Sequence, residues 1–195
     1  MTAKVRKRRP AFDREEGVAI AQNLFHERGY DAVSVADITQ ALDIVPPSLY
    51  AAYGSKTELF ERAMKRYAET EMLPLADILK NERPPAEELS ALFVLATQQY
   101  TRHDTRRGCM ITEGMRADDK TARLKAAALA ENANTTIRDY IAAHNPAEAE
   151  RITDYVLVTL RGLSSYACLG TPAERLIECA RMAGRAFEQD FPAKA

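Results

Sequence analysis

The N-terminus carries the first side chains that could do chemistry. Five Lys and Arg residues between positions 4 and 9 precede the first acidic residue, Asp13. Such cations neutralise DNA phosphates and release counterions, so this arm could clamp a DNA backbone or reach into a minor groove. The alternative is a solvated tail, since the arm lacks apolar periodicity and its like charges repel one another. The segment that follows favours the first interpretation.

The stretch 33–56 has the pattern of two short helices joined by a tight turn. Ser34, Val45 and Ser55 stand at three successive helix starts, and Gly54 stands at a helix end. A small core would be closed by residues at helical spacing, namely Val35, Ile38, Leu42, Ile44, Leu49 and Tyr53. A helix-turn-helix places its second helix in the major groove of DNA, which is wide enough to admit one. The stretch therefore predicts a DNA-binding regulator.

Composition limits the class of protein. The 195 residues are 46% hydrophobic, which is enough for one large or two small buried cores, and 27 basic residues nearly balance 28 acidic ones. Cys109, Cys168 and Cys179 lack metal-site spacing and suit free thiols in a reducing compartment. Neither a secretory signal nor an apolar run of membrane-spanning length occurs, so we expect a soluble cytoplasmic protein with no membrane partner, no metal and no cofactor.

The motifs of common enzyme classes do not occur. The chain contains no G-x-S-x-G, H-E-x-x-H, G-x-G-x-x-G or P-loop sequence. His103 and Asp104 are adjacent, but a catalytic pair needs placement in space that adjacency does not supply. We therefore expect a protein that is not an enzyme. The alternatives are a helical-bundle enzyme, or a helical interaction protein whose DNA-binding unit is vestigial.

Every element from residue 13 onwards is expected to be a helix. Asp13 would cap the first helix, Ser55 with Glu58 would form a capping box, and Asp118 or Asp119 would cap a long alanine-rich helix. Two final helices, 146–169 and 172–189, would begin at Asn145-Pro146-Ala147-Glu148 and Thr171-Pro172-Ala173-Glu174, each with a capping residue, a proline and an acid. The sequence thus predicts an all-α fold.

The segment 38–59 resembles the signature of the TetR family of transcriptional repressors. The matching residues are Leu49, Tyr50, Tyr53, Lys56 and Leu59. The resemblance implies a basic flexible arm (1–10), a three-helix helix-turn-helix DNA-binding domain (11–56), and a helical-bundle effector-binding and dimerisation domain (57–195). It also implies a ligand-responsive homodimeric repressor, which leaves a palindromic double-stranded DNA operator when an unknown small-molecule effector binds.

The resemblance also assigns residues to DNA contacts. Positions that match the family's base-reading residues are Ala36, Pro46, Pro47, Ser48 and Ala52. Positions that match its phosphate contacts are Ser34, Tyr50, Tyr53 and Lys56, with Ala51 close to the DNA backbone.

The chain departs from the family in its turn and at the start of its second helix. Asp43 replaces the usual turn glycine and tolerates a left-handed conformation, and Val45 replaces the usual capping serine. Pro46 and Pro47 offset that loss because neither has an N–H that needs a cap. Since prolines and alanines cannot make bidentate hydrogen bonds to bases, we expect modest selectivity per base pair and a sizeable contribution from the basic arm.

By the same resemblance, the last two helices should pair with their symmetry mates. Interface candidates are Tyr155, Val156, Thr159, Leu163, Leu176, Ala180, Ala183, Gly184 and Phe187. The alternative is that these residues belong to the core of a single chain.

Candidates for an effector pocket combine polar tips with apolar bodies. They are Tyr100, His103, Cys109, Met110, Met115 and Tyr166, and each could instead be plain core or surface. Cys109 also allows an alternative function, a regulator that senses oxidants or a soft metal such as copper(I).

Overall fold

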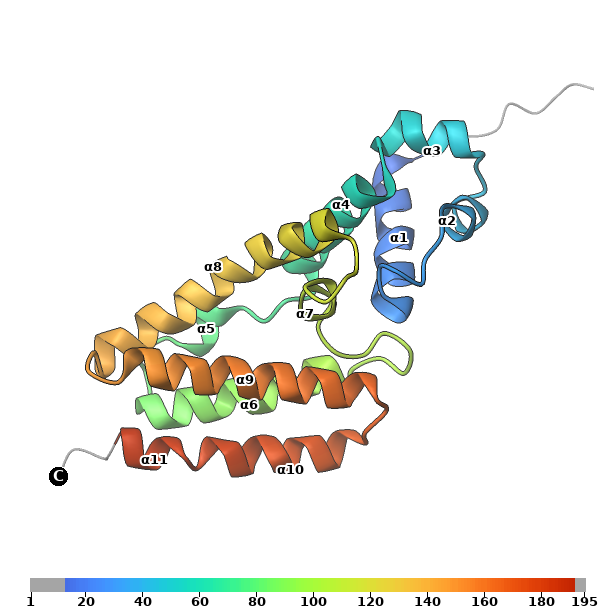
Figure 1. Cartoon of the computed structure of the whole chain (residues 1–195). Helices are drawn as coiled ribbons and strands as arrows, with labels where there is room; N and C mark the ends of the chain where they lie inside the picture. Colours follow the sequence, from blue (N-terminus) through green and yellow to red (C-terminus); the bar gives the residue numbers. More distant parts are fainter. Residues whose placement is uncertain (1–12, 192–195) are drawn as a thin grey trace, which may run out of the picture.

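Residues 13–191 are described by a computed structural model, and they form helices joined by turns (Figure 1), as the sequence predicts. The helices are α1 (Arg14–Arg28), α2 (Val35–Ala41), α3 (Pro46–Tyr53), α4 (Lys56–Thr70), α5 (Leu75–Ile78), α6 (Pro85–Tyr100), α7 (Met110–Gly114), α8 (Lys120–His144), α9 (Ala149–Cys168), α10 (Ala173–Gly184) and α11 (Phe187–Asp190). The first three helices lie at one end of the molecule and α6, α9 and α10 at the other, with α4 and α8 between them (Figure 1).

The predicted caps of the N-terminal helices are present. The Asp13 carboxylate accepts from the backbone N–H groups of Glu15 and Glu16 at 2.9 and 3.3 Å and so begins α1. Val45 begins α3 without a side-chain cap, and its two prolines follow at the first helical positions. Asp43 has a φ of 49°, which fits the left-handed turn expected between α2 and α3. The helix starts and the turn of the helix-turn-helix are therefore determined by residues close together in the sequence.

One core holds the N-terminal helices together and extends beyond them. Leu49 and Tyr53 of α3 pack in the same cluster as Phe60 of α4 and Ile111 of α7. The rings of Phe25 and Phe60 meet edge to face with centroids 5.0 Å apart. The first half of α8 closes this cluster with alanines, whose small side chains allow close helix approach. The helix-turn-helix is thus built on α4, α7 and α8 and is not an independent lobe.

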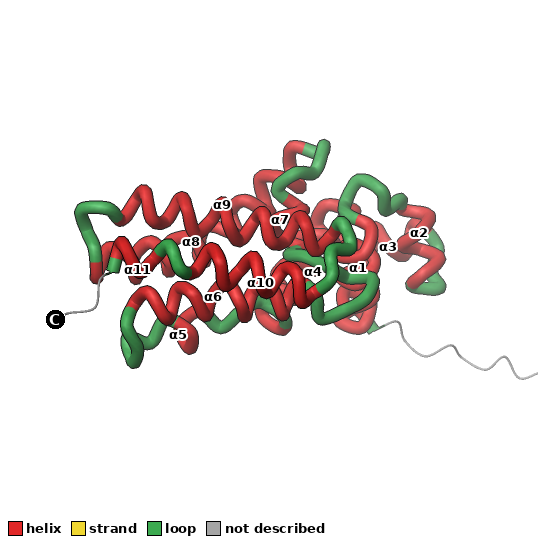
Figure 2. Tube along the Cα trace, turned by 90° about the horizontal axis from the view of Figure 1, so that it is seen from below, coloured by secondary structure: helices red, strands yellow, loops and turns green. Residues whose placement is uncertain are grey.

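A second core fills the opposite end of the molecule. Figure 2 shows α6, α9 and α10 running alongside one another, and side chains from all three, with α5, α11 and the second half of α8, form one buried cluster. Gly184 of α10 faces Ser90 of α6 so closely that a Cβ would lie 2.1 Å from the Ser90 hydroxyl oxygen. The helix α10 therefore packs on α6 through small residues.

Two predicted helix starts are wrong. Asn145 ends α8, and its side-chain amide donates to the carbonyl of Asp190 at 3.1 Å, while α9 starts only at Ala149. Pro172 has extended backbone angles, so α10 starts at Ala173 without a side-chain cap from Thr171. The last predicted helix also ends early, at Gly184. At Asn145 a tertiary contact thus replaces the local cap.

The Ser55 hydroxyl does cap α4 by accepting from the backbone N–H of Glu58 at 3.1 Å. The complete capping box lies at Ser34 and Asp37, where the two residues bond reciprocally.

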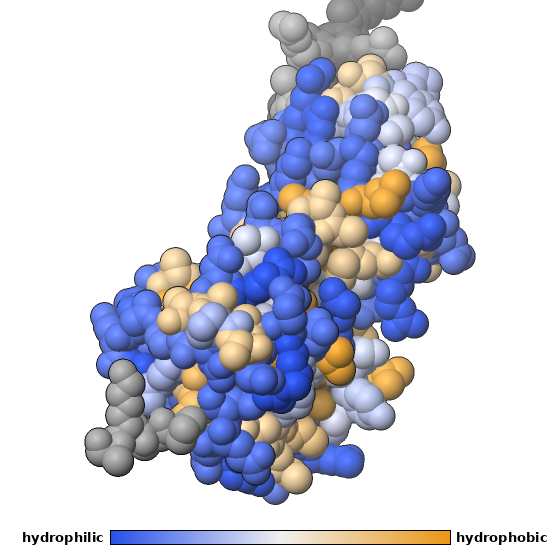
Figure 3. Space-filling model, turned by 60° about the vertical axis from the view of Figure 1, so that its left-hand side comes forward, coloured by the Kyte–Doolittle hydropathy of each residue, from blue (hydrophilic) through white to orange (hydrophobic). Residues whose placement is uncertain are grey.

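The surface is mainly polar. On the face seen in Figure 3, hydrophobic side chains form several separate patches on a mostly hydrophilic surface. Among the helices within residues 13–191, none is long and apolar enough to cross a membrane.

Candidate nucleic-acid interface

The helix α3 presents most of its side chains to solvent. Five of the residues predicted to contact DNA are exposed on it, namely Pro46, Pro47, Ser48, Tyr50 and Ala51, and Ala52 is half-buried. Leu49 is fully buried beneath them, so the helix is held by one side and free on the other. An exposed helix of this length fits the major groove.

Tyr53 belongs to the inner side of α3. Its side chain is only 1% exposed, and its hydroxyl donates to the main-chain carbonyl of Arg14 at 2.9 Å. Tyr53 therefore offers almost no free surface to a phosphate in this structure. Tyr53 follows Leu49 by one helical turn and shares its buried face, so it fixes α3 against α1.

At the start of α2, Ser34 and Ala36 are both exposed. The Ser34 hydroxyl already donates to the Asp37 carboxylate at 2.5 Å, and Arg28 donates to the same carboxylate at 3.0 Å. The hydrogen bonds from Ser34, followed by the one from Arg28, hold the pKa of Asp37 far below its usual value. Ser34 can therefore approach a phosphate, but its hydroxyl proton is already donated to the Asp37 carboxylate.

Lys56 lies at the other end of α3, on the first turn of α4. Its ammonium nitrogen is 4.0 Å from the centroid of the Tyr30 ring, and burial lowers the pKa of the side chain. The Tyr30 hydroxyl is in turn 2.7 Å from the Thr57 hydroxyl. This cation–π contact holds a positive charge beside the end of α3. The basic arm, residues 1–10, lies outside the described residues.

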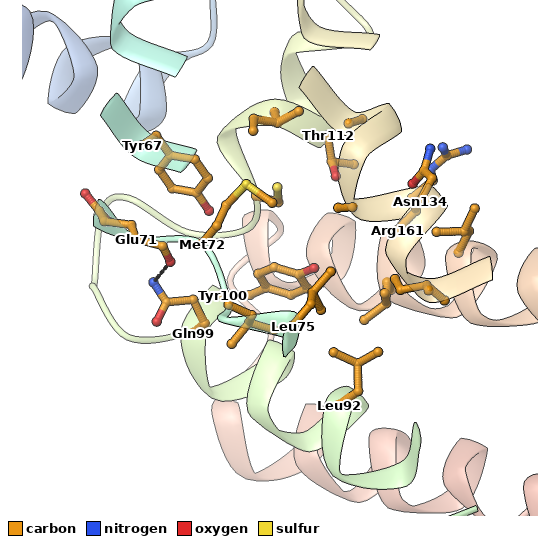
Figure 4. Close-up of a pocket in the computed structure, with 18 of the residues that line it drawn as sticks. Tyr67, Glu71, Met72, Leu75, Leu92, Gln99, Tyr100, Thr112, Asn134 and Arg161 are labelled. Atoms are coloured by element: carbon orange, nitrogen blue, oxygen red, sulfur yellow. Dashed lines mark hydrogen bonds between the residues drawn. The ribbon is translucent and has the colours of Figure 1, made fainter. Parts of the chain in front are cut away.

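A cavity of about 100 Å³ lies between the end of α4 and helices α6, α7, α8 and α9 (Figure 4). Three of the six predicted effector-pocket residues line it: Tyr100, Cys109 and Met115. Most of the remaining wall is apolar, and Tyr67, Thr112 and Arg161 add polar groups that the sequence analysis did not single out. Tyr67 lies on the apolar stripe of α4, and the sequence of such a stripe does not indicate which of its residues line a cavity.

The other three predicted pocket residues lie elsewhere. Met110 is buried in the N-terminal core, and Tyr166 is 60% exposed on the outside of α9. The ring of His103 lies on the loop after α6, with Nε2 3.1 Å from a guanidinium nitrogen of Arg106. These three do not line this cavity, because residue type does not specify which side of a helix faces it.

The predicted interface residues fall into a buried group and a half-buried group. Six of them are buried within this chain and have no surface to offer a partner: Val156, Leu163, Leu176, Ala180, Gly184 and Phe187. Tyr155, Thr159 and Ala183 are half-buried, and the Tyr155 hydroxyl donates to the Ala183 carbonyl at 2.8 Å. The single-chain alternative therefore holds for most of this set.

Other apolar side chains of α9 and α10 are exposed. Val158 and Tyr166 of α9 are 68% and 60% exposed, Leu169 at the end of α9 is 76% exposed, and Met182 of α10 is 57% exposed. Gly162 lies between Val158 and Tyr166 at helical spacing, with nothing near its missing Cβ. We call Val158, Gly162, Tyr166, Leu169 and Met182 the α9/α10 face.

All three cysteines are free thiols. Burial is the main cause that raises the pKa of Cys168 to about 11, which disfavours the reactive thiolate. The Cys109 backbone N–H donates to the Ser164 hydroxyl at 2.9 Å. Within residues 13–191, no group of three or more His, Cys, Asp or Glu side chains could hold a metal ion.

Comparisons with known proteins point to one family. Residues 18–63 match the family described as bacterial regulatory proteins, tetR family. The HTH-type transcriptional repressor BdcR of Escherichia coli K12 is 44% identical over 91% of this chain and 90% of its own length. The repressor ComR of the same strain is 31% identical over 55% of this chain and 52% of its own length.

Solved structures extend the likeness to the whole fold. A cysteine mutant of the TetR family transcriptional regulator CifR, complexed with a 26-base-pair double-strand operator DNA, has a TM-score of 0.81 and 27% identity, and covers 92% of this chain and 99% of its own. A TetR regulator from Chloroflexus aurantiacus has a TM-score of 0.73 at 22% identity, covering 90% of this chain and 93% of its own, which supports the fold.

Proposed function

The chain belongs to the TetR family of bacterial transcriptional regulators, and we propose that it is a homodimeric repressor that leaves a palindromic DNA operator when a small molecule enters the cavity between α4 and α9. The observation that carries this proposal is the outward side of α3. Its exposed residues stand on the buried anchors Leu49 and Tyr53, within the segment that matches the family. In this role the protein needs no catalytic residue.

We assign residues 11–56 to DNA binding and residues 57–195 to effector binding and dimerisation. The shared core of α1, α4, α7 and α8 supports a mechanical link between the two parts, since α4 packs on both the helix-turn-helix and the cavity. A ligand that displaces the end of α4 would tilt α3 through this core. A dimer converts such a tilt into a changed spacing of two α3 helices, which weakens binding to paired half-sites.

Dimerisation is proposed through the α9/α10 face. Its exposed apolar side chains lie on two adjacent helices, and Gly162 leaves room for a facing helix to approach. A short recognition helix contacts only a few base pairs, so the second copy supplies the rest of the specificity.

The test is a fluorescence-anisotropy titration of DNA from the protein's own promoter region at physiological salt, with excess unrelated DNA as competitor. We expect a specific complex for the unchanged chain and none for Ser48→Glu, which places a negative charge on the exposed side of α3. Gln98→Glu, on the exposed surface of α6, is the matched control and should bind as the unchanged chain does. The absence of a specific complex with the unchanged chain would overturn the proposal.

A further inference from the structure

The cavity is lined by a tyrosine whose hydroxyl faces its empty space. Tyr100 is only 9% exposed, and its hydroxyl points into the cavity (Figure 4). Within residues 13–191, that hydroxyl makes no hydrogen bond with another side chain or with the backbone. A ligand that displaces water from the cavity must give this hydroxyl a partner, because otherwise the hydroxyl loses its hydrogen bond.

Burial also determines what the hydroxyl can offer. It raises the pKa of Tyr100 far above the ordinary value for tyrosine, because the charged phenolate would be poorly solvated. The side chain therefore stays neutral and protonated at any physiological pH. A neutral phenol has one proton to donate, and its best partner is a ligand oxygen that accepts a hydrogen bond.

Charged groups near the cavity are turned away from its interior. The Glu71 carboxylate points away from the cavity (Figure 4) and binds Gln22 of α1. The Glu71 main-chain carbonyl accepts from the Gln99 amide at 2.7 Å. Arg161 is exposed and lies beside Asn134 at the opposite end of the cavity (Figure 4). A charged ligand would therefore lose its hydration without an opposite charge in the interior.

The rest of the wall favours an apolar body. Side chains in contact with the empty space include Leu92, Ile111, Met115, Ile137, Leu157 and Leu160. A volume of about 100 Å³ is what roughly three water molecules occupy in the liquid. This limits a ligand to a compact molecule such as one substituted aromatic ring.

We propose that the cavity binds a small uncharged molecule with a mostly apolar body and one carbonyl-type oxygen, which accepts a hydrogen bond from the Tyr100 hydroxyl. The inference rests on the proposed function, in which this cavity is the effector site. It adds that Tyr100 determines the specificity and that the effector is neutral.

Three probes of matched size separate the terms of this proposal: acetophenone has the carbonyl, cumene replaces it with a carbon, and benzoate carries a charge. Isothermal titration of the full chain without DNA should give saturable binding of acetophenone, about 10-fold tighter than cumene for one hydrogen bond, with benzoate the weakest. Tyr100→Phe should weaken acetophenone binding about 10-fold and leave cumene binding unchanged within about 2-fold. Thr121→Val, which removes an exposed hydroxyl at the start of α8 and away from the cavity, should change neither.

A second variant locates the site. Ala133 lines the cavity, so Ala133→Leu should reduce the binding of both acetophenone and cumene by filling the space. Acetophenone that fails to saturate, that binds no tighter than cumene or benzoate, or that binds Tyr100→Phe as well as the unchanged chain would overturn the inference. If the chain binds its operator but none of the probes, only the proposed ligand class is contradicted. If the chain binds the probes but forms no operator complex, the proposed function is contradicted.

Discussion

The side-chain amide of Gln22 on α1 donates to the carboxylate of Glu71 at the end of α4, over 2.5 Å. Gln22 is fully buried, and its own oxygen accepts from Arg66 at 2.7 Å. Arg106, on the loop after α6, reaches the same carboxylate oxygen of Glu71 at 3.3 Å. Because Glu71 also lies at the cavity wall, this network joins the DNA-binding helices to the proposed effector site.

Replacing Gln22 with alanine should destabilise the protein by about 1–3 kcal/mol, because Glu71 and Arg66, which are both partly buried, each lose a hydrogen bond. Urea denaturation followed by circular dichroism measures this change. Gln98→Ala, at an exposed position of α6, should stay within about 0.5 kcal/mol of the unchanged chain. Equal stability of the two variants would show that the network contributes nothing to folding.

His26 should make stability depend on pH. Its Nε2 lies 3.2 Å from the carbonyl oxygen of Gly108, its Nδ1 is buried without a partner, and its ring packs edge to face on Tyr67. Burial is the main cause that lowers its pKa below 6.5. The Gly108 carbonyl and Glu71 oppose this effect.

The direction of the pH effect follows from this lowered pKa. Below pH 6.5 the unfolded chain binds a proton at His26, whereas the folded chain stays neutral until the pH reaches its lower pKa. Stability from this residue is therefore complete above pH 6.5 and is lost as the pH falls through the window below it. The neighbouring cations Arg106 and His103 act in the same direction.

Denaturation midpoints measured between pH 8 and pH 5 test this effect. His26→Gln should lose less stability across that range than the unchanged chain. His144→Gln, at an exposed position near the end of α8, should keep the original pH profile. A His26→Gln profile that parallels the original would show that another group is responsible.

A charge placed on the α9/α10 face should separate the proposed dimer. Val158→Glu would bring like charges together across a two-fold axis and bury them without partners, so we expect the dissociation constant to rise at least about 100-fold. Analytical ultracentrifugation measures the association. Leu124→Glu, at a comparably exposed apolar position on α8, should leave the dimer intact. A Val158→Glu chain that stays dimeric at the same concentration would place the interface elsewhere.

Removing the charge of Lys56 should weaken DNA binding by a similar factor whatever the sequence of the DNA. Lys56→Met keeps an alkyl chain beside Tyr30 but loses one phosphate contact, so the slope of log K against log salt should fall by about one. Anisotropy titrations at several salt concentrations give this slope. Lys65→Met is the control, since that side chain pairs with Glu61 on the same helix. An unchanged slope for Lys56→Met would remove Lys56 from the phosphate contacts.

Helix caps and tight turns depend on residues close together in the sequence, and most of them were predictable. Asp13, Ser34 and Ser55 cap their helices as the sequence indicates, and Asp43 adopts the left-handed turn. A cap involves a side chain and a backbone group within three residues, so its energy is fixed by local sequence. At Asn145 the same kind of pattern gave the wrong helix start, because its side chain contacts Asp190 instead.

The sequence by itself determined that the chain is all-helical, that its N-terminal part is a helix-turn-helix, and which side of α3 carries the exposed residues. Only the tertiary structure decided that Tyr100 rather than Tyr166 faces a cavity, and that Val158 rather than Val156 is exposed. Helical periodicity shows that a helix has an apolar stripe, but the position of neighbouring helices decides what covers it. On α9, which packs against both α6 and α8, apolar residues occur on covered and uncovered sides alike, and spacing alone cannot separate them.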